Sequence, residues 1–147
     1  MTMKKSIALD FVGISSEYNG GASVFAKTFL SELVSRSDLP IHIIVNQSQK
    51  SSFEETLHPA PNVVLHGFES QNSNICRILH FIATRVMQSP KLLAWVQRYR
   101  WKNAINFIET NCDSYFSLTT YISFPLKNTI HLLLLVILEF SYLFQIY

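Results

Sequence analysis

Three of the four glycines in this chain, Gly13, Gly20 and Gly21, lie within nine residues, between a strand-like and a helix-like run. Because glycine has no Cβ, its backbone N–H group can approach an anion closely. A helix N-terminus adds unpaired N–H donors and a partial positive charge. The pattern therefore predicts a loop that binds a phosphate or a similar oxyanion. It also fits a tight turn that only closes a strand–helix connection.

Other sites of chemistry are not indicated by the sequence. The glycine spacing matches neither GxGxxG nor GxxxxGK[ST], so the common dinucleotide and P-loop fingerprints are absent. The five histidines are scattered and form no metal-binding spacing, so no metal is expected. Cys76 and Cys112 are far apart in sequence, as expected of two reduced thiols in a cytoplasmic protein.

The elements that position the glycine loop follow from hydrophobic periodicity. Residues 6–12 form a strand-like run, and apolar residues then recur at spacings of three and four from Gly21 to Leu33, with Ser23 on the solvent side. The remaining segments predict strands at 41–45, 62–68 and 114–118, and helices at 47–57, 75–87 and 91–110. Alternating strands and helices predict an α/β fold, a Rossmann-like parallel sheet with helices on both faces. In such sheets ligands bind beyond the carboxyl ends of the strands, where the glycine loop begins.

The glycine loop and the following helix, "GISSEYNGGASVFAKTFLSEL", resemble the start of GT-B glycosyltransferases of the family-4 type. In that family a Gly-Gly loop precedes a helix with spaced small and apolar residues. The matching positions are Gly20, Gly21, Ala22, Val24, Phe25, Leu30 and Leu33. The stretches "HIIVNQSQ", "PNVVLHGF" and "CDSYFSLTTYISFP" are similar to the second, third and fourth strands of the family, so the resemblance covers residues 5–127.

This resemblance implies half of a GT-B fold, with residues 1–127 as a partial acceptor-side domain. The intact enzyme would transfer a sugar from a nucleotide-sugar donor to a hydroxyl acceptor, with no metal or other cofactor. The loop residues Gly20 and Gly21, with Tyr18 and Asn19 beside them, would approach the donor diphosphate or the acceptor. No catalytic residue is assigned.

The chain also departs from the family pattern. The family binds its donor mainly through a second domain with a paired-glutamate motif, which this sequence lacks. Leu132 follows His131 where the family has an aspartate. Residues 128–147 form an apolar tail unlike the family, although Glu139 argues against a membrane span. A frameshift or premature stop near residues 128–131 would explain the tail, and the chain would then be a truncated, inactive fragment.

Two other functions stay open at the level of sequence. The first is a small α/β module that binds a phosphate or nucleotide without catalysis. The second is a membrane-attached protein that uses the apolar tail. The helical stretch from Lys91 to Lys102 carries Arg98 and Arg100 beside tryptophan, which would suit peripheral contact with an anionic membrane at its inner face. The same stretch also fits a solvated helix packed on the sheet. The net charge of +2 is too small to indicate nucleic acid as a partner.

Overall fold

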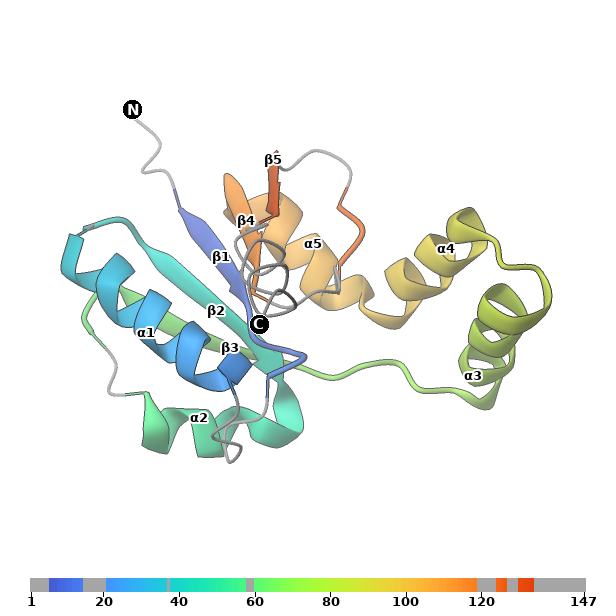
Figure 1. Ribbon diagram of the computed structural model, residues 1–147, viewed down its shortest axis with the longest axis horizontal. Coiled ribbons are helices and arrows are strands. Elements are labelled where there is room, and N and C mark those ends of the chain that lie inside the picture. Colours follow the sequence, from blue (N-terminus) through green and yellow to red (C-terminus); the bar gives the residue numbers. More distant parts are fainter. Residues whose placement is uncertain are drawn as a thin grey trace, which may run out of the picture.

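The computed structural model describes residues 6–14, 21–36, 38–57, 60–118 and 124–126, and the backbone of residues 130–133. Within these residues the chain forms one parallel sheet with helices around it (Figure 1). The strands are β1 (Ile7–Asp10), β2 (Ile41–Asn46), β3 (Val63–Phe68), β4 (Ser114–Ser117) and β5 (Ile130–Leu133). The helices are α1 (Gly21–Arg36), η1 (Gln47–Gln49), α2 (Lys50–Thr56), α3 (Asn74–Phe81), η2 (Ile82–Val86), α4 (Pro90–Arg100) and α5 (Lys102–Asn111).

The strand order β3-β2-β1-β4-β5 confirms the predicted Rossmann-like arrangement. In chain order, β2 pairs with one side of β1, and β3 then pairs with β2. β4 pairs with the other side of β1. The order of the strands therefore reverses between β1 and β4. Loops on either side of such a reversal leave the sheet in opposite directions, which opens a crevice at the carboxyl ends of the strands.

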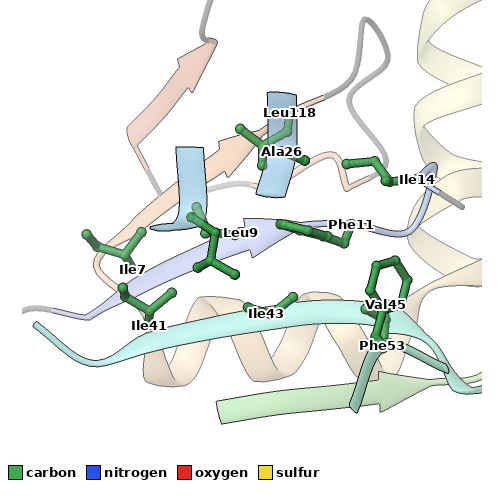
Figure 2. Packing of buried hydrophobic residues seen from close by; sticks show 11 residues of the cluster. Ile7, Leu9, Phe11, Ile14, Ala26, Ile41, Ile43, Val45, Phe53 and Leu118 are labelled. Carbon is green, nitrogen blue, oxygen red and sulfur yellow. The ribbon is translucent and has the colours of Figure 1, made fainter. Parts of the chain in front are cut away.

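One face of the sheet is covered by α1 and α2. Alternate residues of β1 and β2 point to this face because side chains alternate along a strand. Figure 2 shows them meeting Ala26 of α1 and Phe53 of α2. The buried cluster consists of Ile7, Leu9, Phe11, Ile14, Ala26, Leu30, Ile41, Ile43, Val45, Phe53 and Leu118.

The opposite face of the sheet is covered by α5. The intervening residues of β1, β2 and β4 pack there against apolar residues of α5, so helices cover both faces as predicted. This second cluster consists of Ala8, Ile44, Trp101, Ala104, Ile105, Ile108, Tyr115, Phe124 and Leu126. Two separate apolar layers of this kind account for the runs of apolar residues in the strands.

The single helix predicted for residues 91–110 is wrong. The structure divides it at Trp101, which has φ −112° and ψ 26°, into α4 and α5. The physical reason is that the two apolar stripes of this stretch serve different partners. Trp101 is buried with α5 against the sheet, whereas Val96 is the buried residue of α4 and packs toward α3. The Arg98 guanidinium of α4 donates hydrogen bonds to Glu109 Oε1 at 3.3 Å and to the backbone oxygen of Pro125 at 2.6 Å. These bonds hold the bend in place.

The helix predicted for residues 75–87 is present, and its final part is the π-helical turn η2. The Met87 N–H group donates to the Ile82 oxygen at 2.8 Å, which is the wider spacing of a π turn. Ser73 and Ser89 cap the starts of α3 and α4 by accepting hydrogen bonds from the backbone N–H groups of Cys76 and Leu92. These two serine caps therefore fix the residues at which α3 and α4 begin.

Strand β5 lies within the segment 128–147 that the sequence analysis separated from the domain. It pairs with β4 in parallel, with His131 opposite Tyr115. His131 therefore lies inside a strand, near its start. The backbone of residues 130–133 extends the sheet beyond β4.

Candidate functional site

The carboxyl ends of β1 and β4 meet at the reversal of strand order, and the glycine loop begins there as predicted. β1 ends at Asp10 and pairs with Ser117 of β4 in register. A short turn follows, in which the Ile14 N–H group donates to the Phe11 oxygen at 3.0 Å. The Phe11 N–H group donates to the Ile44 oxygen, so β2 also anchors the start of this loop.

Asp10 joins the two strands that form this edge. Its side chain is fully buried, and Oδ2 accepts a hydrogen bond from the Tyr115 hydroxyl at 2.7 Å. Oδ1 accepts from the Val12 N–H group at 2.9 Å, at the first turn of the glycine loop. Burial, and then the negative charge of Asp10, raises the pKa of Tyr115 far above its usual range, so this hydroxyl stays protonated and can donate. The Asp10 carboxylate therefore positions the start of the loop.

Ser23 is the residue of this region that sequence reasoning placed incorrectly. It was expected on the solvent side of α1, but it is only 3% exposed. Among the residues that the structure describes, no group forms a hydrogen bond with its Oγ. An unbonded buried hydroxyl costs about 1–3 kcal/mol. Ser23 lies two residues after Gly21, so a buried hydroxyl that no described residue bonds lies in the first turn of α1.

The predicted binding residues are only partly described. Tyr18, Asn19 and Gly20 lie outside the described residues. Gly21 begins α1 and is exposed. Among the described residues, no heavy atom lies within 4 Å of the position that a Cβ would take on Gly21. Packing against the described residues therefore does not require a glycine at this point.

A histidine pair lies on the α5 face of the sheet, away from the glycine loop. His42 Nδ1 and His66 Nε2 share a hydrogen bond at 3.0 Å between β2 and β3. The ring of Phe107 covers the pair, with 4.3 Å between the centres of the Phe107 and His66 rings. Burial lowers the pKa of His42. Burial, and then the charges of His42 and Lys50, lowers the pKa of His66.

The lowered pKa values predict a loss of stability in acid. Below the ordinary histidine pKa of about 6.5 the unfolded chain binds protons that these two folded histidines resist. The free energy of unfolding is therefore highest above that pH and falls as the pH drops below it. Urea midpoints measured from pH 8 to about pH 5 should show this fall, and His66→Gln should flatten it. Val64→Gln, an exposed change on the same strand, should leave the slope unchanged; an equal slope in the His66→Gln variant would contradict the assignment.

A hollow of about 380 Å³ lies between α1, α2 and the strands β2 and β3. Its walls are mostly apolar, and Lys27 and Glu54 are the charged residues at its border. It is next to the short helix α2, and Val63 and Leu65 of β3 also line it. It does not lie at the carboxyl ends of β1 and β4, and its lining contains no residue of either strand.

Groups that could hold a metal ion do not occur in the described part of the chain: no three His, Cys, Asp or Glu side chains gather there. Cys76 and Cys112 are both free thiols, and burial raises the pKa of Cys112 to about 11.

None of the described helices is long and apolar enough to cross a membrane. Comparisons with protein-family models, curated proteins and solved structures give no match.

Proposed function

We propose that this chain is the acceptor-side half of a GT-B glycosyltransferase, whose glycine loop takes part in binding the diphosphate of a nucleotide-sugar or the hydroxyl acceptor. The observation that carries the proposal is the buried Ser23 hydroxyl, without a partner among the described residues, at the N-terminus of α1. This helix begins where the strand order reverses, which is the usual ligand position in sheets of this type. Its N–H groups and partial positive charge favour an anion.

The chemistry at this edge would be positioning and charge stabilisation. Phosphate oxygens accept hydrogen bonds from backbone N–H groups of the loop and from the Ser23 hydroxyl, which stabilises a leaving diphosphate. Asp10 keeps the start of the loop in place through Val12. The second domain of the enzyme would supply the main contacts to the donor. A sugar-transfer assay over a panel of donors should therefore show little or no turnover by this chain, and robust turnover would contradict the need for a second domain.

The Ser23→Ala variant distinguishes an effect on ligand binding from an effect on folding. Removing an unbonded buried hydroxyl should leave the free energy of unfolding unchanged or raise it by about 1 kcal/mol. The ligands are nucleoside diphosphates, nucleotide-sugars and pyrophosphate, and their binding is measured by saturation-transfer NMR. Their affinity for the Ser23→Ala protein should be about tenfold lower, because one hydrogen bond to a charged oxygen is lost. Ser31→Ala, at an exposed position of α1, is the matched control. A Ser23→Ala protein that loses stability and binds like the wild type would rule out this site.

The alternative function is a phosphate- or nucleotide-binding module that acts without catalysis, which the same edge favours. The two proposals differ in affinity. A complete module should bind a nucleotide tightly by itself, whereas half of a two-domain enzyme should bind it weakly. Titration of the folded chain with the same panel distinguishes them, because only the module reaches micromolar dissociation constants.

A further inference from the structure

Helices α3, η2 and α4, residues 74–100, form a lobe that stands away from the sheet (Figure 1). We refer to these residues as the α3–α4 lobe. Nine large apolar side chains in the described part of the chain are exposed, and seven of them belong to this lobe. The seven are Ile75, Ile78, Phe81, Val86, Met87, Trp95 and Tyr99. Contiguous exposed apolar surface of this kind marks a contact site.

The apolar side chains of the two helices border a common surface. Ile75 of α3 and Trp95 and Tyr99 of α4 line one hollow of about 250 Å³. The Trp95 and Tyr99 rings stack with 6.2 Å between their centres. On α3, Ile75, Ile78 and Phe81 are exposed at spacings of three, so they form a stripe along the helix. Both helices therefore present apolar surface that no described residue covers.

The positive charge of the lobe indicates what kind of partner would contact this apolar surface. The lobe carries five Lys and Arg residues and no Asp or Glu, while the rest of the chain carries seven basic and ten acidic residues. Its cations are Arg77, Arg85, Lys91, Arg98 and Arg100. Of these five cations, only Arg98 forms an ion pair with a described residue, Glu109. The basic residues are thus concentrated in the same lobe as the exposed apolar side chains.

A second hollow in the lobe, of about 310 Å³, is lined by Arg77, His80 and Arg100. The Nε atom of Arg100 is buried there and has no hydrogen-bond partner among the described residues. Arg100 also lies over the Trp101 ring, 5.9 Å from its centre. A phosphate oxygen is an acceptor that such a donor would satisfy.

We propose that the α3–α4 lobe docks on the surface of an anionic phospholipid membrane. Aliphatic side chains enter the boundary between headgroups and acyl chains, Trp and Tyr favour that boundary, and Lys and Arg contact lipid phosphates. A second copy of this chain fits less well, because a two-fold contact through the lobe would bring two sets of five cations together. This proposal rests on the lobe alone and does not depend on the proposed function.

The test is co-sedimentation of the full chain with vesicles of phosphatidylcholine containing phosphatidylglycerol, compared with phosphatidylcholine alone. The chain should pellet with the anionic vesicles, less so at high salt, with a blue shift in the fluorescence of exposed Trp95. The triple variant Arg77→Gln/Arg85→Gln/Lys91→Gln should partition on the order of 100-fold more weakly, since each cation contributes about fivefold. A second variant, Ile78→Ser/Phe81→Ser, should lose binding and the fluorescence shift at any salt concentration.

The controls are changes of the same kind outside the lobe. Val24→Ser/Val64→Ser removes exposed apolar side chains from α1 and β3, and Arg36→Gln removes an exposed cation from α1. Both should bind vesicles like the wild type. All substituted lobe residues are exposed, so each variant should keep the wild-type urea midpoint. Wild-type binding by both lobe variants would assign membrane contact to another part of the chain and overturn the proposal. No vesicle binding, with lobe-dependent binding of DNA or lobe-dependent dimers instead, would also overturn it.

Discussion

Phe53→Ala should lower the free energy of unfolding by about 3–5 kcal/mol, because it removes a fully buried aromatic side chain. Phe53 is the only buried residue of α2, so its loss leaves this helix without an anchor on the sheet. The Phe53 ring also meets the edge of the Phe11 ring, with 5.7 Å between their centres. Phe11 directly follows β1, and the change should therefore also loosen the start of the glycine loop.

Urea unfolding followed by circular dichroism measures this effect. Phe81→Ala is the matched control, since Phe81 is 60% exposed and its removal should cost no more than about 0.5 kcal/mol. The difference between the two variants should be several-fold larger than the error of extrapolation. Equal urea midpoints for the two variants would mean that Phe53 is not part of the core.

Tyr115→Phe should lower the free energy of unfolding by about 1.5–3 kcal/mol, the usual effect of losing a hydrogen bond to a charged group. The change keeps the ring in the α5-face cluster and removes only the hydroxyl that donates to Asp10. The buried Asp10 carboxylate would then keep the bond from the Val12 N–H group and lose the one that joins β1 to β4. We also expect the carboxyl edge of these strands, where the proposed ligand binds, to become less rigid.

The control for this prediction is Tyr99→Phe, which removes a hydroxyl from a half-exposed tyrosine of α4. It should change the stability by less than about 0.5 kcal/mol. Hydrogen exchange of the Val12 amide should accelerate in the Tyr115→Phe protein and not in the control. An unchanged urea midpoint and unchanged exchange at Val12 would show that the Asp10–Tyr115 bond does not hold the loop.

The sheet and most helices could be predicted because their signals are local. Apolar runs such as the one at Ile41 mark strands covered on both faces, and the period of three and four after Gly21 marks a helix. The alternation of these elements then fixes a parallel sheet and places the glycine loop at its carboxyl edge. The structure confirms the parallel sheet, the helix that begins at Gly21 and the start of the loop at the carboxyl end of β1.

The parts that were missed depend on tertiary contacts. The bend at Trp101 follows from two apolar stripes that face different partners, which a single periodic pattern does not distinguish. Ser23 was placed on the solvent side by its polarity, and only the packing of α1 on the sheet reveals that it is buried. The partner of Asp10 lies 105 residues away in sequence. The one sequence signal for it was an aspartate inside an apolar strand.

The measurement that tests the central proposal most directly is the sequence of the genomic DNA beyond codon 127, read in all three frames. If the chain is half of a GT-B glycosyltransferase, one of these frames should encode a His-Asp motif and then a second α/β domain with paired glutamates. Such a domain would supply donor contacts in addition to those proposed for the glycine loop and Ser23. The absence of such a domain from all three frames would contradict the proposal and favour an independent phosphate-binding module.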